Sequence, residues 1–485
     1  MADKKPTPEE VQASQWYPKY HVAPPIGWLN DPNGFSYFKG EYHIFYQYHP
    51  NSAKWGPMHW GHSTSKNLYE WKHQPIAIAP DRVEYDWDGC FSGCGFEKDG
   101  KLYLMYTGQT ETKKVGEKKK VVEKQCMAVS EDGIHFEKLE GNPFILAPEE
   151  NDVEVANFRD PKIWEHDGKY YCAIGSKSLR AEAQVALFES DDFFNWKFKA
   201  VTARAQGNEG KMWECPCFAH FGDDYVMLIS PQHIKPEGRL FQNLHQSGYM
   251  IGKLDYDTGK FSHGKFYMFD YGFDFYATTL MKDPNGRYLI ITWLAMWETL
   301  YPEQKDGWAT MLTIPRELQF RNGKLYTVPP KELEGLRGKC IAHENLKLDK
   351  PTKLDGVKGS VGELLLEIDT KKSRTFKIAL RAGGKDEDEE RTVLLYDEDT
   401  KVLTLNRNMA GAGPKGTREV ELTPFDKLKL RIYMDKSSLE IFINDGEFVM
   451  TTRVYPRDES DDIIFIPTSD VLKIDSVKFY PFDNL

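Results

Sequence analysis

The sequence has no hydrophobic run long enough to span a membrane, and its N-terminal Met-Ala-Asp-Lys-Lys-Pro lacks the apolar core of a signal peptide. It has no Asn-x-Ser/Thr acceptor for glycosylation, and its seven cysteines are an odd number for a disulfide framework. These absences favour a cytoplasmic protein that does not bind membranes. A mature secreted form whose signal peptide has been removed is the alternative that the sequence leaves open. A formal net charge of −11 argues against nucleic acid as a partner, because phosphate binding needs a basic patch.

Two cysteine pairs, Cys90/Cys94 and Cys215/Cys217, are close in sequence, but neither has histidine partners at the spacing of a zinc site. We therefore expect no metal at either pair. Aromatic residues, in contrast, are abundant and make up 13% of the 485 residues. They favour β-strands and also offer flat surfaces to sugar rings. We expect most of them in a β-core and only a few in sugar stacking.

A repeated pattern runs through the first two thirds of the chain. An aromatic strand and a second strand are followed by a polar turn of the type Ser-x-Asp/Asn that leads to another aromatic, with turns starting at 65, 130, 190 and, more loosely, 255. A fifth copy covers 288–293 and 325–328. The interval of 60 to 65 residues suits one four-stranded antiparallel blade, which must stack radially with others to bury its faces. We predict a five-bladed β-propeller over residues 1–335.

The composition changes after Pro329-Pro330. Residues 331–337 are typical of a short helix or linker, and closely spaced alternating strands follow at 363–368, 376–380, 428–433 and 439–443. Asn444-Asp445-Gly446 is a hairpin turn signal. This pattern predicts a β-sandwich domain over 345–485, so the fold class is all-β. We expect exposed loops at the charged runs 113–124 and 385–391.

Three carboxylates stand in marked turn-like settings. They are Asp31 in Asn-Asp-Pro-Asn-Gly, Asp160 in Arg-Asp-Pro, and Glu214 in Trp-Glu-Cys-Pro. In a propeller we expect each just ahead of an innermost strand, so that they meet at the central channel. Asp31 could equally be a turn aspartate and Asp160 an ion-pair partner of Arg159. Glu214 has an apolar neighbourhood that predicts a raised pKa, as a general acid requires, and glycoside hydrolysis needs a pair of carboxyl groups.

These three motifs, in this order, resemble glycoside hydrolase family 32, the family of invertases, sucrose-6-phosphate hydrolases and fructanases. The resemblance covers almost the whole chain, including a C-terminal β-sandwich. It extends to Phe45-Tyr46-Gln47-Tyr48-His49-Pro50, Trp55-Gly56, Phe91-Ser92-Gly93 and Asp274-Phe275-Tyr276-Ala277.

The resemblance implies retaining hydrolysis of β-fructofuranosides without a metal or other cofactor. Asp31 would be the nucleophile, Glu214 the acid/base, and Asp160 the residue that holds fructose hydroxyls in the transition state. Retention predicts a separation of about 5–5.5 Å between the Asp31 and Glu214 carboxyls. The family positions that line the fructose subsite correspond to Asn30, Gln47, Trp55, Phe91, Ser92 and Arg159. Trp293 and Tyr276 are further candidates that core packing explains equally well.

Several alternatives remain open on the same scaffold. The substrate could be sucrose, sucrose 6-phosphate or a short fructan, and a sugar acceptor could replace water in a transfructosylation. The expected absence of a leader favours an intracellular disaccharide. An arabinanase or xylosidase propeller would also use two Asp and one Glu, but in other sequence contexts. A non-catalytic sugar-binding propeller would have no reason to keep all three carboxylates.

Overall fold

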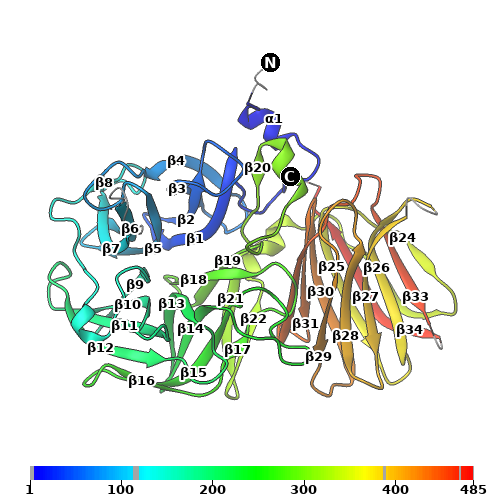
Figure 1. Cartoon of the computed structure of the whole chain (residues 1–485). Helices are drawn as coiled ribbons and strands as arrows, with labels where there is room; N and C mark the ends of the chain where they lie inside the picture. Colours follow the sequence, from blue (N-terminus) through cyan, green and yellow to red (C-terminus); the bar gives the residue numbers. More distant parts are fainter. Residues whose placement is uncertain (1–4, 113–119, 386–388, 469–470, 484) are drawn as a thin grey trace.

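The computed structural model describes residues 5–112, 120–385, 389–468, 471–483 and 485, and these are mainly β-strands (Figure 1). A single α-helix occurs in the described ranges, α1 (Pro8–Gln12), which Thr7 and Glu10 begin with a reciprocal capping box. Three short 3-10 helices accompany it: η1 (Glu149–Asn151), η2 (Pro302–Asp306) and η3 (Lys331–Leu336). The all-β prediction is confirmed, and η3 confirms the short helix expected there. No helix of the described residues has the length and apolar character needed to cross a bilayer.

Residues 27–328 form five sheets, counted over the described part of the chain. The first has the order β20-β1-β2-β3-β4, with β1 (Gly27–Phe38), β2 (Glu41–His49), β3 (His59–Ser65), β4 (Lys72–Ile78) and β20 (Trp308–Ala309). The second contains β5 (Gly89–Lys98), β6 (Lys101–Thr112), β7 (Lys120–Ser130) and β8 (Glu137–Lys138). The third contains β9 (Phe158–His166), β10 (Lys169–Lys177), β11 (Ala183–Ser190) and β12 (Lys197–Arg204).

The fourth and fifth sheets follow the same plan. The fourth contains β13 (Met212–Phe221), β14 (Asp224–Gln232), β15 (Gly248–Asp255), β16 (Lys260–His263) and β17 (Tyr267–Met268). The fifth contains β18 (Tyr276–Lys282), β19 (Tyr288–Trp293), β21 (Arg316–Arg321) and β22 (Lys324–Val328). The first strands of the five sheets contact one another in a ring, in which β1 contacts β5, β5 contacts β9, β9 contacts β13, β13 contacts β18, and β18 contacts β1.

The aromatic runs predicted from the sequence lie in the second strand of each sheet, in β2, β6, β10, β14 and β19. The strand before each of them is the innermost one, and Asp31, Asp160 and Glu214 lie inside these strands. The expectation that they precede the innermost strands was therefore wrong. The prolines in these strands have no N–H to donate, which hides the strand pattern in the sequence.

The polar turns work as the sequence predicts. In the second sheet, the Asp132 carboxylate accepts hydrogen bonds from the backbone N–H groups of Ile134 and His135, both at 2.8 Å. In the third, Asp192 accepts from the N–H groups of Phe194 (3.0 Å) and Asn195 (2.8 Å). Each turn thus satisfies its own backbone and starts the outermost strand.

Two six-stranded sheets make up the rest of the described chain, at the right of Figure 1. One contains β23 (Ile341–Leu348), β25 (Gly362–Asp369), β30 (Lys427–Asp435), β31 (Ser438–Ile443), β32 (Phe448–Arg453) and β34 (Leu472–Pro481). The other contains β24 (Thr352–Lys358), β26 (Thr375–Gly383), β27 (Glu390–Asp397), β28 (Val402–Met409), β29 (Thr417–Glu421) and β33 (Asp462–Pro467). One large apolar cluster draws on strands of both sheets.

The charged runs expected as loops are only partly described. Residues 120–124 belong to β7, which pairs with β6, so this part of the expected 113–124 loop is a strand. The ranges 113–119 and 386–388 lie outside the described residues.

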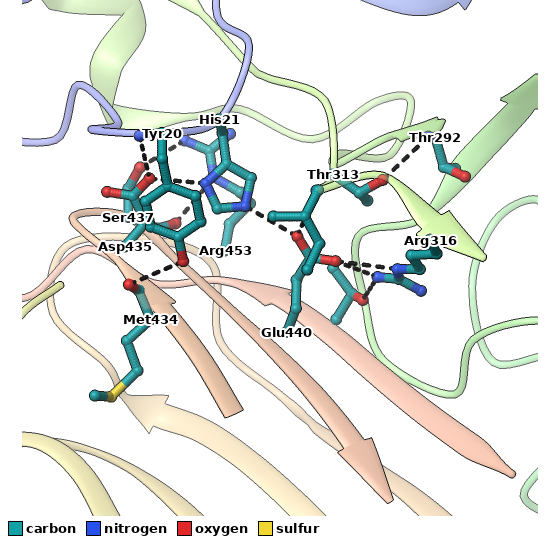
Figure 2. Close-up of polar contacts among 12 residues, drawn as sticks. Tyr20, His21, Thr292, Thr313, Arg316, Met434, Asp435, Ser437, Glu440 and Arg453 are labelled. Atoms are coloured by element: carbon teal, nitrogen blue, oxygen red, sulfur yellow. Dashed lines mark hydrogen bonds and ion pairs between the residues drawn. The ribbon is translucent and has the colours of Figure 1, made fainter. Parts of the chain in front are cut away.

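Buried ion pairs join the two groups of sheets (Figure 2). His21 lies between Asp435 (2.7 Å) and Glu440 (2.9 Å), and Arg316 also binds Glu440. Burial lowers the pKa of His21, but the hydrogen bonds to the two carboxylates outweigh it and raise the pKa to about 9. His21 is therefore a cation at neutral pH, and it ties the N-terminal segment to β30 and β31.

Candidate active site

Each of the five first strands has a β-bulge near its start. The pairing register shifts between Leu29 and Pro32 in β1, between Phe91 and Gly93 in β5, opposite 173–175 in β9, between Glu214 and Cys217 in β13, and between Tyr276 and Thr279 in β18. Bulges re-aim side chains and are frequent beside active sites. A small cavity of about 20 Å³ is lined by residues of all five strands, among them Pro32, Ser92, Asp160, Cys215 and Thr278. The bulges therefore bring these strands together at one level.

Asp31 lies at the bulge of β1 and is partly exposed. Its Oδ2 accepts a hydrogen bond from Ser92 Oγ (2.7 Å), and its Oδ1 accepts one from Asn30 Nδ2 (3.0 Å). Asn30 is itself fixed by the indole N–H of Trp28 (2.8 Å). Burial and the negative charge of Glu214 raise the pKa of Asp31 to about 6.

Glu214 lies on β13 and is bound by two donors. Its Oε1 accepts a hydrogen bond from Arg159 Nε (2.9 Å) and forms an ion pair with Nη2 of the same guanidinium (2.8 Å), and its Oε2 accepts a hydrogen bond from the Tyr276 hydroxyl. Burial raises the pKa of Glu214, but the charge of Arg159 and the hydrogen bonds from Tyr276 and Arg159 lower it more. The net shift is downward, so the raised pKa that we expected from the apolar sequence context was wrong. Its cause lies on other strands, where Arg159 and Tyr276 stabilise the anion.

Asp160 is buried, and its backbone has a φ of +63°. The N–H of Cys215 donates to its Oδ2 (3.0 Å), and its own N–H donates to Thr107 Oγ1 (3.0 Å). Burial and the charge of Glu214 raise the pKa of Asp160 well above its usual range. The Asp160 carboxyl does not pair with the adjacent Arg159, whose hydrogen bonds go to Glu214, Glu123 and Asn157.

Three carboxyl groups thus share one centre with a single bound guanidinium, and their environments differ. Asp31 and Asp160 are held by neutral donors and have raised pKa values, whereas Glu214 is held by a cation. Carboxyls whose surroundings separate their protonation states are the means by which one site supplies both an acid and a base. This arrangement suits glycoside hydrolysis.

Comparisons with known proteins agree with this chemistry. The model of the glycosyl hydrolases family 32 N-terminal domain matches residues 21–329, and that of the family 32 C terminal matches residues 332–481. The chain belongs to glycosyl hydrolase family 32. It is 39% identical to a raffinose invertase of Escherichia coli, over 93% of this chain and 91% of that protein. It is 38% identical to a sucrose-6-phosphate hydrolase of Escherichia coli, over 94% and 92%.

Solved structures of family 32 proteins have the same fold. A mutant Bombyx mori GH32 beta-fructofuranosidase in complex with sucrose superimposes with a TM-score of 0.85 at 34% identity, covering 98% of this chain and 96% of that one. The sucrose-6-phosphate hydrolase of Lactobacillus gasseri gives 0.88 at 30% identity, covering 98% and 95%.

Most of the residues that the sequence indicated for the family 32 fructose subsite lie near the carboxylates or near one another. Asn30 and Ser92 bind Asp31, and Arg159 binds Glu214. Gln47 is buried, and its Nε2 donates to the carbonyl of Cys90 (2.9 Å). The two aromatics meet edge to face, Trp55 against Phe91 at 6.3 Å between ring centres, and Trp55 is 49% exposed.

Trp293 is placed differently. It is fully buried, its Nε1 donates to Thr310 Oγ1 (2.8 Å), and its ring packs edge to face on Trp28 and Trp297. Trp293 therefore exposes no surface in this structure, and its direct role in substrate binding stays a prediction. Its packing supports Trp28, which in turn holds Asn30.

Glu123 belongs to the site, although no sequence motif indicated it. It lies on β7, its Oε2 accepts from the N–H of Phe158 (2.7 Å), and both of its oxygens lie 3.3 Å from Arg159 Nη1. Glu123 thereby holds Arg159 toward Glu214. No local signal marks it, because it stands in a lysine-rich run that suggests a solvated loop, and only the pairing of the sheets buries it.

Cys90 and Cys94 lie on β5, and Cys215 and Cys217 lie on β13. All seven cysteines are unpaired, and no group of three or more His, Cys, Asp or Glu in the described ranges is arranged to hold a metal ion.

Proposed function

We propose that the chain is a retaining β-fructofuranosidase that cleaves the fructosyl bond of sucrose or sucrose 6-phosphate and releases fructose. The observation that carries this proposal is the meeting of three carboxyl groups on strands of one ring, with Asp31 and Glu214 close enough for the charge of Glu214 to raise the pKa of Asp31. The names of the relatives support the substrate, since they include a raffinose invertase, sucrose-6-phosphate hydrolases and a beta-fructofuranosidase in complex with sucrose.

The architecture that we propose for this function is a five-bladed β-propeller over residues 1–335, followed by a β-sandwich over 345–485. The ring of contacts among the five first strands supports the first part. The parallel pairing of β20 with β1 supports ring closure, because it joins the end of the last blade to the beginning of the first. The apolar cluster drawn from both six-stranded sheets supports the sandwich. The seven unpaired cysteines support a cytoplasmic location.

In the proposed reaction, the Asp31 carboxylate attacks the anomeric carbon of the fructosyl unit while Glu214 protonates the departing glycosidic oxygen. Glu214 then removes a proton from water, which hydrolyses the fructosyl-enzyme. Asp160 would accept hydrogen bonds from fructose hydroxyls. The active form needs Asp31 ionised and Glu214 protonated. The raised pKa of Asp31 and the lowered pKa of Glu214 favour the proton on Asp31, so this proton must move to Glu214 before the reaction. The carboxyls therefore titrate as a cluster.

The direct test measures kcat/KM of the purified protein for sucrose, sucrose 6-phosphate and 1-kestose, from the release of glucose, glucose 6-phosphate or fructose. We expect cleavage of sucrose, of its 6-phosphate, or of both, with 1-kestose the poorer substrate. The first product seen by NMR should be β-fructofuranose, as retention requires. The α-anomer as first product, or no cleavage of any of the three, would rule the proposal out.

Lys177 is the residue that we propose as receiver of a sugar phosphate. Lys177 is the last residue of β10, and alternation along the strand places its side chain on the same side as that of residue 175. A Cβ added to Gly175 would lie 2.3 Å from the carbonyl oxygen of Trp213, the residue before Glu214, so this side of β10 faces Glu214. Its ammonium group has no ion pair or hydrogen bond within the described residues. Burial and the charge of Arg159 lower its pKa. The part of the substrate that leaves with the oxygen protonated by Glu214 would lie on this side.

We predict that Lys177→Met lowers kcat/KM for sucrose 6-phosphate by about ten- to a hundredfold, the value of one charge-assisted hydrogen bond. The effect on sucrose should be much smaller, because sucrose offers no anion. Lys169→Met, at the exposed far end of the same strand, is the matched control. Equal losses of kcat/KM with both sugars would show that Lys177 does not recognise the phosphate, and they would leave the proposed hydrolysis unaffected.

A further inference from the structure

The segment Phe269–Phe275, which links β17 to β18, runs along β32, the edge strand of its six-stranded sheet. The N–H of Tyr271 donates to the carbonyl of Val449, and the N–H of Phe273 donates to that of Thr451, both at 2.8 Å. A Cβ on Gly272 would lie 2.1 Å from the Thr451 oxygen, so only glycine allows this approach. The linking segment therefore covers the sheet edge and is fixed to it by its backbone.

Asp274 attaches this segment to the six-stranded sheets through an ion pair and hydrogen bonds. Its Oδ2 accepts hydrogen bonds from Arg407 Nη1 (2.5 Å) and from the backbone N–H of Arg453 (2.8 Å), and its Oδ1 accepts one from the Tyr301 hydroxyl (3.1 Å). Asp274 is 1% exposed, and Arg407 also covers the ring of Phe273 at 3.8 Å. Breaking one partner of such a buried pair is costly, so the position of Asp274 is tightly set.

Tyr276 stands two residues after Asp274 and begins β18. Its hydroxyl group donates a short hydrogen bond to Glu214 Oε2 and lies 3.2 Å from the carbonyl oxygen of Ser230. Because Tyr276 follows the linking segment directly, the point at which this segment leaves β32 sets the position of the Tyr276 hydroxyl relative to Glu214.

We propose that Asp274 and Arg407 are positioning residues for the acid/base carboxylate: they hold Tyr276 at the point where its hydroxyl meets Glu214. The C-terminal sheets thereby contribute to catalysis through one buried ion pair. This inference rests on the proposed function, because it needs Glu214 to act as the acid/base.

A readout for this role is the limb of the pH profile of kcat/KM that the titration of Glu214 sets. Because the pKa of Glu214 is lowered and that of Asp31 is raised to about 6, this is the acid limb. The titratable or charged groups that face Glu214 are Arg159, Glu123, Asp31, Asp160, Lys177, Cys215, His245 and Tyr276. Tyr276 follows the linking segment directly, and the stretch that contains His245 is also bonded to it, through Asn243 and Ser247. Without the Tyr276 hydroxyl, the carboxylate loses a donor, so the pKa of Glu214 rises and the limb moves to higher pH, by about one to two pH units.

The experiment compares four variants of the full chain: Tyr276→Phe, Arg407→Gln, the double variant, and Arg381→Gln as control. Arg381 is an equally buried arginine on β26, and it binds only carbonyls of the same group of sheets, at Ser460, Asp435 and Lys436. Melting temperature and the pH profile of kcat/KM are measured for each. Arg407→Lys, which keeps the charge, tests for rescue, and Asp274→Asn replaces Arg407→Gln if that variant does not fold.

We expect Arg407→Gln to move the acid limb to higher pH, in the same direction as Tyr276→Phe, with the double variant no further displaced than Tyr276→Phe alone. Arg381→Gln should lower the melting temperature and leave the limb in place. A wild-type limb in Arg407→Gln, or additive shifts in the double variant, would overturn the inference. An inactive wild-type protein would instead overturn the proposed function, so the two failures are distinguishable.

Discussion

Asp31→Ala is expected to abolish turnover of the preferred fructoside while leaving the protein folded. The loss should reach at least about a thousandfold in kcat, the scale seen when a covalent nucleophile is removed. Ser92 and Asn30 orient the carboxylate by hydrogen bonds, and in the variant no carboxylate remains for them to orient. The measurement is kcat by steady-state release of glucose or glucose 6-phosphate, with circular dichroism as the check on folding.

The stability of Asp31→Ala gives a second, independent signature. The pKa of Asp31 is raised to about 6 in the folded protein, so ionisation of the group costs stability above that pH. The variant should therefore melt at the same or a higher temperature than the wild type at pH 7 to 8. Asp86→Asn is the matched control, since Asp86 is a fully buried carboxylate bound by Tyr106 and Lys138 in the second sheet. We expect that variant to melt lower and to keep its activity.

The same pKa sets one limb of the wild-type profile. Because Asp31 holds its proton more tightly than Glu214, the pair carries the one proton that the reaction needs only between the two pKa values, so kcat/KM should fall as the pH rises through about 6. Near-normal turnover in Asp31→Ala, or a profile that stays flat from pH 5 to pH 8, would contradict the nucleophile assignment.

The sequence indicated the all-β class, the family and the three carboxylates, because each depends on local patterns. Alternation marks strands such as those containing Tyr42 and Leu439, and the Asn-Asp-Pro-Asn-Gly, Arg-Asp-Pro and Glu-Cys motifs are contiguous. The sequence did not indicate the innermost strands β1, β9 and β13. Their prolines, Pro32, Pro161 and Pro216, and the bulges beside them interrupt the two-residue alternation of side chains that marks a strand.

What the sequence could not indicate are contacts made across sheets. The pKa of Glu214 is governed by Arg159 and Tyr276, which are 55 and 62 residues away in the chain. In the sequence, Trp293 is an ordinary aromatic residue of the run 288–293, and its burial against Trp28 and Trp297 depends on packing between strands. Such electrostatic and packing effects arise only when the ring of strands has formed.

Glu214→Ala should lower kcat/KM for sucrose by about a hundredfold to ten-thousandfold, the usual contribution of a general acid. The loss should be small for formation of the fructosyl-enzyme from an aryl fructoside whose phenolate leaves without a proton. Azide should restore turnover of that substrate, because it attacks the intermediate without a base.

Unlike Asp31→Ala, Glu214→Ala should be less stable than the wild type at neutral pH. The folded-state pKa of Glu214 is lowered, so its charge stabilises the protein above the unfolded pKa, and its loss leaves Arg159 with only Glu123 as a buried counter-ion. Equal losses with sucrose and the aryl fructoside would show that Glu214 is not the acid/base, and a melting temperature that rises would contradict the lowered pKa of its carboxyl. Opposite stability changes in two variants that both lose activity would show that Asp31 and Glu214 lie in opposite electrostatic environments of one site.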